Sequence, residues 1–145
     1  MTFGDWEDVH AALLLALGLL AEGNFLILGE PTADPLPKRG LFGRRAKPAA
    51  TRYVQVLRIE DLYTAECVGA TSMGGTWEMS QASIDRLLSL GWRSPEESTR
   101  EFDSVVPNFD MYVALTAAPT LAELLVETLR HLGAQPQDLT LQTSQ

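Results

Sequence analysis

The sequence predicts an α+β fold in which helices pack on one face of an antiparallel sheet. Segments with an apolar helical face stand near both ends of the chain and again over residues 80–90. Between them lie short runs rich in β-branched and aromatic residues, which favour strands. Two of these runs are separated by only two residues, which is the spacing of an antiparallel hairpin. The predicted order of elements is therefore α-β-β-β-α-β-α.

The first predicted helix extends from about Gly4 to Leu20, and Thr2 or Asp5 can cap it. Its buried face is predicted from apolar residues at helical spacing, namely Trp6, Val9, Leu13, Leu17 and Leu20. Further apolar residues lie elsewhere on the helix: Leu14, Leu15 and Leu19. Either the domain covers both faces, or the second face meets another chain, because large exposed apolar patches usually mark interfaces. These three leucines are the candidate face of a homodimer.

Four segments are predicted to be strands: 25–29, 53–59, 62–68 and 109–115. Glu60 and Asp61 join the second and third in a tight hairpin. The fourth alternates apolar residues with others at a period of two, which is typical of a strand with one buried face.

The segment from Ser80 to Pro95 predicts a capped helix followed by a buried tryptophan. The Ser80 hydroxyl can accept from free N–H groups of the first turn. Gly91 stands where a left-handed residue ends a helix, and Pro95 stops any continuation. Trp92 follows the glycine directly, so we expect it to pack against the first or the last helix.

The last predicted helix begins near Pro119, which suits a first helical position, and ends at Gly133. Its predicted buried face is made of leucines: Leu121, Leu124, Leu125, Leu129 and Leu132. Residues 137–145 are predicted to be a frayed or loosely docked tail.

Length and composition predict a single domain over residues 1–145. The chain is 46% hydrophobic, enough for an ordinary core, and has no internal repeat. One cysteine, Cys67, permits no internal disulfide, which favours a reducing cytoplasm. The longest apolar run, 11–21, is too short to span a bilayer and follows acidic residues, unlike a signal peptide. We expect a soluble, cytoplasmic protein.

Charge is distributed unevenly along the chain. The net charge of −8 argues against nucleic acid as a partner. Segment 33–50 nevertheless holds five of the eleven basic residues, with prolines and glycines that exclude regular structure. These five are Lys38, Arg39, Arg44, Arg45 and Lys47. The segment is predicted to be a flexible basic loop. It is either a solvated connector or a docking arm for an acidic partner, with Leu41 and Phe42 as an apolar anchor.

No pattern in the chain predicts catalysis. The two histidines, His10 and His131, have no spacing typical of a metal site, and His131 suits a helix C-terminus. Cys67 lies in a predicted strand, where a buried, inert thiol is expected. Gly74-Gly75 lacks the pattern of a phosphate-binding loop. We therefore expect no catalytic residue, no metal and no cofactor.

Binding is then predicted to use the surface. A module of this kind can hold an extended protein segment by strand addition or in an apolar groove. Trp77, beside Gly74-Gly75, is the best candidate for an exposed aromatic contact. The strand that begins at Tyr53 is the second predicted contact region.

Several short motifs occur in an order that resembles a known family. They are Tyr53-Val54-Gln55, Ala65-Glu66, Leu90-Gly91-Trp92 with Pro95, Asn108-Phe109, and Leu121-Ala122 with Thr128-Leu129-Arg130. The chain is similar, over roughly residues 6–139, to actinobacterial proteins grouped with type III secretion chaperones and YbjN-like proteins as peptide-binding chaperones. The resemblance implies a twisted antiparallel sheet against helices, and a non-enzymatic role in binding protein or peptide clients.

The sequence therefore predicts a small chaperone-like binding module, and one alternative stays open. Capture of many unfolded or peptide clients would fit a chaperone. One stoichiometric partner would fit the alternative, a small regulatory or structural subunit of a larger complex.

Overall fold

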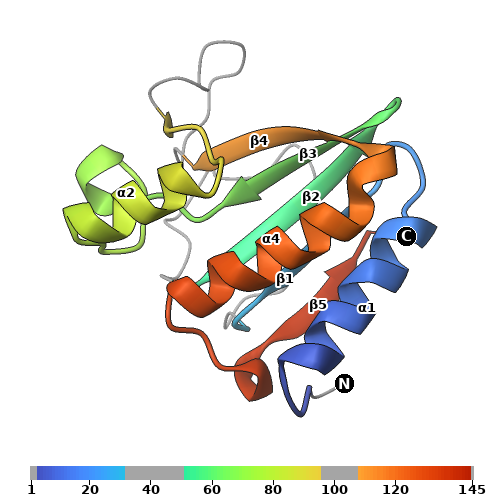
Figure 1. Cartoon of the computed structure of the whole chain (residues 1–145), viewed down its shortest axis with the longest axis horizontal. Helices are drawn as coiled ribbons and strands as arrows, with labels where there is room; N and C mark the ends of the chain where they lie inside the picture. Colours follow the sequence, from blue (N-terminus) through green and yellow to red (C-terminus); the bar gives the residue numbers. More distant parts are fainter. Residues whose placement is uncertain (1–2, 32–50, 96–107, 145) are drawn as a thin grey trace.

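The computed structural model describes residues 3–31, 51–95 and 108–144. They form two layers, with helices lying over one face of a sheet (Figure 1). The helices are α1 (Trp6–Leu19), α2 (Gln81–Ser89) and α4 (Ala118–His131), with short 3-10 turns η1 (Thr71–Met73), η2 (Leu115–Ala117) and η3 (Pro136–Asp138). The strands are β1 (Phe25–Gly29), β2 (Tyr53–Ile59), β3 (Leu62–Cys67), β4 (Phe109–Ala114) and β5 (Thr140–Thr143).

The sheet has the strand order β4-β3-β2-β1-β5, and every neighbouring pair is antiparallel. The predicted hairpin is confirmed, because Ile59 pairs with Leu62 across Glu60 and Asp61. Glu60 takes a positive φ of 54°, as tight hairpin turns require. β4 and β5 are the two edges of the sheet among the described residues.

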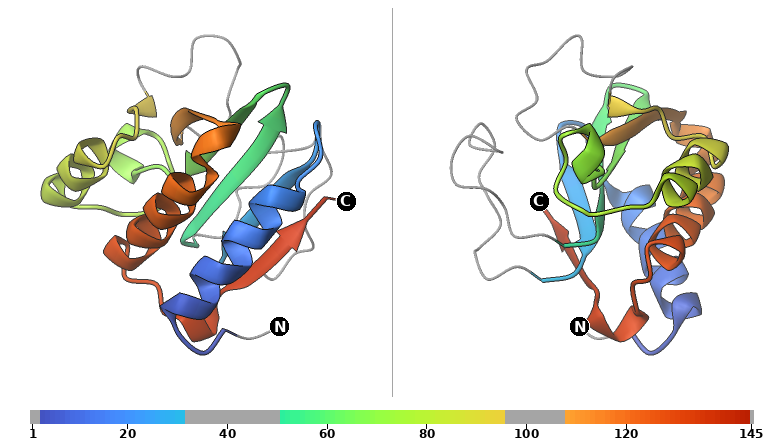
Figure 2. Two further views of the ribbon diagram at one scale, coloured as in Figure 1. Left: turned by 45° about the vertical axis from the view of Figure 1, so that its right-hand side comes forward. Right: turned by 90° about the vertical axis from the view of Figure 1, so that its left-hand side faces the viewer.

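The core lies between the sheet and the helices α1 and α4, which run side by side in opposite directions (Figures 1 and 2). One face of the sheet supplies residues that are fully buried, among them Leu26, Leu28, Val54, Val56 and Ala65. The helices supply their apolar stripes, Val9, Leu13 and Leu17 from α1 and Leu121, Leu125 and Leu129 from α4. The predicted α+β fold with helices on one face is therefore confirmed.

The segment from Ser80 to Trp92 is built as its sequence predicts. The Ser80 hydroxyl accepts from the Ser83 N–H at 3.1 Å and caps α2. Gly91 has a φ of 113°, which a side chain would strain. Trp92 is 2% exposed, and its indole N–H donates to the Thr128 hydroxyl of α4 at 2.9 Å. The buried tryptophan is confirmed, with the last helix as its neighbour.

The C-terminal segment is more ordered than the frayed or loosely docked tail predicted over residues 137–145. Thr140–Thr143 forms β5, which pairs with β1, and Leu139 just before it is 1% exposed. Ser144 closes the ladder, since its N–H donates to the Phe25 carbonyl at 2.9 Å. The short polar strand escapes prediction because its stability comes from an apolar neighbour more than a hundred residues away. The sheet therefore has five strands.

In the described part of the chain, no helix combines the length and the apolar character needed to cross a membrane.

Candidate functional site

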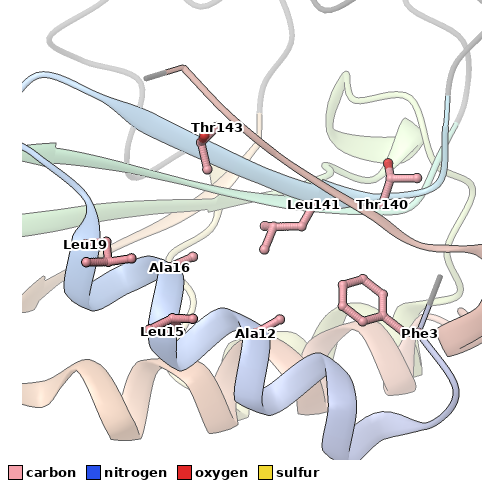
Figure 3. Close-up of a pocket in the computed structure, with 8 residues that line it drawn as sticks. All are labelled: Phe3, Ala12, Leu15, Ala16, Leu19, Thr140, Leu141 and Thr143. Atoms are coloured by element: carbon pink, nitrogen blue, oxygen red, sulfur yellow. The ribbon is translucent and has the colours of Figure 1, made fainter. Parts of the chain in front are cut away.

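An apolar groove lies between α1 and the edge strand β5 (Figure 3). Its volume is about 370 Å³. Its lining comes from the N-terminal segment, α1 and β5: Phe3, Ala12, Leu15, Ala16, Leu19, Thr140, Leu141 and Thr143. None of these side chains carries a charge, although the chain as a whole has a net charge of −8.

The wall formed by α1 combines short and long side chains. Ala12 and Ala16 pack partly against the core, and their small size leaves the space between helix and strand open. Leu15 and Leu19 lie four residues apart on the same side of the helix, and each is 66% exposed (Figure 3). The groove is therefore bordered by two large apolar side chains that are mostly in contact with solvent.

The wall formed by β5 is a strand whose outer edge has no neighbour among the described residues. In an antiparallel ladder, successive residues bond alternately toward one neighbour and then the other. The bond from the Ser144 N–H to the Phe25 carbonyl fixes this alternation, so that Gln142 bonds toward β1. Leu141 and Thr143 therefore turn their N–H and C=O groups outward, beside the groove.

The three leucines predicted to form a dimer face do not lie together. Successive residues of a helix are rotated by about 100°, so Leu14 and Leu15 point in different directions. Leu15 and Leu19 line the groove, whereas Leu14 does not and is only 37% exposed. The homodimer itself stays a prediction.

Trp77 is half-buried and is not part of the groove. The Arg52 guanidinium lies over its ring, 4.5 Å from the centroid. Arg52 also donates to the Leu132 carbonyl at 2.8 Å and pairs with Glu30. One face of the indole is thus covered by an arginine that joins the start of β2 to the end of α4.

Tyr53 begins β2, which is paired with β1 on one side and β3 on the other. This central position leaves no edge for an added strand at β2, and Tyr53 as a contact residue stays a prediction. The Tyr53 hydroxyl accepts from the Asn108 side-chain amide at 3.1 Å, and the same amide donates to Glu66 at 3.0 Å. Burial raises the pKa of Tyr53 to about 12 and also raises the pKa of Glu66.

The other side chains considered for chemistry are hydrogen-bonded between elements or buried in the core. His131 Nε2 lies 2.9 Å from the Ser83 hydroxyl and 3.1 Å from the Ser83 carbonyl, and so ties α4 to α2. Cys67 is fully buried, and its burial raises the pKa of the thiol. Within residues 3–31, 51–95 and 108–144, no three His, Cys, Asp or Glu side chains are grouped to hold a metal ion.

The predicted basic loop, with Leu41, Phe42 and its five basic residues, lies outside the described residues. The chain on either side of it is held together. The Glu30 N–H donates to the Arg52 carbonyl at 3.0 Å, and the two side chains form an ion pair.

Sequence reasoning found Leu15 and Leu19 but missed the rest of the groove. Ala12 and Ala16 were missed because alanine on a helix carries no distinctive signal. The β5 edge was missed because TLQT is short and polar. The alternation of Leu139 and Leu141 is the one local signal of a strand there.

One family model matches residues 2–145, almost the entire chain. Its description is TY-Chap3, "T3SS (YopN, CesT) and YbjN peptide-binding chaperone 3". No curated protein and no solved structure matches the chain. The matched region includes both walls of the groove. The chain therefore belongs to the TY-Chap3 family of peptide-binding chaperones.

Proposed function

We propose that this protein is a non-enzymatic chaperone that holds an extended, uncharged segment of a client protein in the groove between α1 and β5. The observation that carries the proposal is an apolar groove placed directly beside a strand edge that no other described strand covers. Membership of a peptide-binding chaperone family supports a protein or peptide as the ligand.

The surroundings of the groove support a polypeptide over a small metabolite. Its volume of about 370 Å³ is at the lower end of the roughly 300–1,000 Å³ that ligand pockets occupy. Pockets that recognise small molecules combine an apolar lining with a few convergent polar groups. Here the polar groups of the lining are two threonine hydroxyls and the peptide groups of an edge strand. Peptide groups of this kind are what another polypeptide backbone can bond.

The remaining predicted contacts keep their place in the proposal. Trp77 and Tyr53, near the start of β2, offer a second contact region for a client. The basic segment 33–50 would attract acidic clients through Lys38, Arg39, Arg44, Arg45 and Lys47, with Leu41 and Phe42 as an anchor. The single cysteine supports the reducing cytoplasm as the place of action.

The function is tested by placing a charge in the groove. Leu15→Arg changes an exposed side chain, so the fold is expected to remain intact. Ala11→Arg is the matched control, because Ala11 is exposed on α1 and does not line the groove. The probe is a fluorescent peptide of seven alternating threonine and leucine residues, and its binding is measured by anisotropy.

We expect Leu15→Arg to weaken peptide binding by about 10-fold or more, equivalent to about 1.4 kcal/mol. Ala11→Arg is expected to bind within about twofold of the unmodified protein, since distant surface changes have small effects. Equal binding by both variants would show that clients do not use this groove. Capture of a single stoichiometric partner from cell extract would instead support the regulatory or structural subunit.

A further inference from the structure

Resting on the proposed function, we infer that the client binds as an added strand on the outer edge of β5, which no described strand covers. The hydrogen bonds that hold it come from Leu141 and Thr143. The ligand class is an extended segment with apolar side chains at every second position and polar ones between them.

The backbone hydrogen bonds of β1 show which groups of β5 point outward. Two bonds on different sides of β1 give the same alternation. Ser144 donates to the Phe25 carbonyl, and Arg58 donates to the Asn24 carbonyl at 3.0 Å. Odd-numbered residues of β1 therefore bond toward β5, and even-numbered ones bond toward β2. On β5 this leaves the N–H and C=O groups of Leu141 and Thr143 for a further strand.

The side-chain directions of β5 show which client residues would enter the groove. Leu141 pairs with Leu28 and Thr143 pairs with Leu26, both of which face the helices from the buried side of the sheet. Residues directly opposite each other in a sheet place their side chains on the same face. Client residues opposite Leu141 and Thr143 would therefore enter the groove. The client residue between them would lie on the other face, beside Gln142.

The lining of the groove determines which client side chains can enter it. Client side chains entering the groove meet the short Ala12 and Ala16 and the exposed Leu15 and Leu19. Within the described part of the chain no charged side chain lines this space, so a charged client residue there would lose hydration without a partner. The position beside Gln142 has no such restriction. The groove thus selects an apolar-polar-apolar pattern.

A second copy of this chain is the competing occupant of the same edge. A client strand needs only the two outward-facing residues of β5 and two side-chain positions in the groove. The family whose model matches residues 2–145 is described as peptide-binding, which favours a peptide segment over a second copy.

The test is backbone amide hydrogen exchange of the full chain, followed by NMR with and without the alternating threonine–leucine peptide. In the free protein, the Leu141 and Thr143 amides are expected to exchange faster than that of Gln142, which bonds toward β1. Saturating peptide should slow Leu141 and Thr143 by about 10-fold or more, because each added hydrogen bond protects its donor. A control peptide of the same composition, with leucine at every third position, should bind about 10-fold more weakly.

Three outcomes separate the possibilities. Peptide binding with unchanged exchange at Leu141 and Thr143 would overturn strand addition and leave the proposed function standing. If the peptide does not bind under any condition, both strand addition and the proposed function are overturned. Protection of these two amides in the free protein that disappears on dilution would identify a second copy as the occupant and overturn the client strand.

Discussion

Individual side chains in this protein join elements that are far apart in sequence. Trp92 follows the end of α2, yet its indole N–H reaches Thr128 in α4. Thr128 in turn donates to the Leu124 carbonyl at 2.8 Å, so its hydroxyl serves as acceptor and donor at once. Both side chains are buried, so the indole N–H of Trp92 would lose its hydrogen-bond partner without the Thr128 hydroxyl.

Trp92→Ala is expected to lower the free energy of unfolding by about 3–5 kcal/mol, as large-to-small changes in cores do. Thr128→Val should cost about 1–3 kcal/mol, because it leaves the buried indole N–H unsatisfied. Chemical denaturation measures both changes. Adding Trp92→Phe to Thr128→Val tests the bond itself, since the double variant should cost less than the sum of the single ones. Additive costs would show that the bond contributes nothing.

Glu66 is a residue whose stability contribution depends on pH. Burial raises its pKa above 4.5, and the nearby Asp110 adds to this, although the bond from Asn108 opposes it. A carboxyl with a raised pKa in the folded state destabilises the protein as pH rises through the interval between the unfolded and folded values. The penalty is absent below pH 4.5 and complete above the folded pKa.

We therefore expect Glu66→Gln to be as stable as the unmodified protein at acidic pH and more stable at neutral pH. Glutamine keeps an oxygen that can accept from Asn108 and carries no charge to desolvate. Urea denaturation at a series of pH values gives the difference. A variant that is less stable at pH 7 than at pH 4, relative to the unmodified protein, would contradict this assignment.

At the scale of elements, the prediction succeeded where the signal was local. The side-chain caps Asp5 and Ser80, the apolar stripes of α1, α2 and α4, and the apolar runs of β1 to β4 all depend on residues close together in the sequence. β5 failed because Thr140–Thr143 gains its strand conformation from pairing with β1, which no local pattern reveals. Because β5 was not predicted, the candidate site was not predicted either. Leu15 and Leu19 were marked as unusual, but without β5 they have no second wall.

Leu139 gives a direct test of whether the C-terminal segment is docked. Leu139→Ala is expected to cost about 2–5 kcal/mol, because its side chain is 1% exposed. Gln142→Ala is the matched control, since Gln142 is exposed and points away from the helices, and it should change stability by less than about 0.5 kcal/mol. Thermal and urea denaturation provide the comparison. Equal, small effects would restore the frayed tail that the sequence predicts.

At the scale of the whole molecule, the groove is assembled from the two ends of the chain. Phe3 and α1 supply one wall and β5 supplies the other, although they are separated by more than 100 residues. Any change that detaches β5 would remove its outer edge and the groove together. Folding of the entire chain is therefore a condition of binding, and the site has no counterpart in an isolated segment.

The last whole-molecule property is charge. Segment 33–50 holds five basic residues and one acidic residue. The rest of the chain holds six basic and 18 acidic residues. Replacing Lys38, Arg39, Arg44, Arg45 and Lys47 by Gln should slow association of a threonine–leucine peptide carrying four glutamates, by about 10-fold at low salt. Dissociation should not change, because steering acts on encounter. Stopped-flow fluorescence measures both rates, with the thermal midpoint as the control for folding.

Salt decides whether that effect is electrostatic. The Debye length falls from about 30 Å at 0.01 M to about 3 Å at 1 M, so long-range attraction is lost at the higher concentration. The unmodified protein and the variant with five glutamines should then bind the glutamate peptide at the same rate in 1 M salt and at different rates in 0.01 M salt. The uncharged threonine–leucine peptide should associate equally fast with both proteins throughout. If the glutamate peptide does so as well, the basic segment is a solvated connector, and client choice belongs to the groove alone.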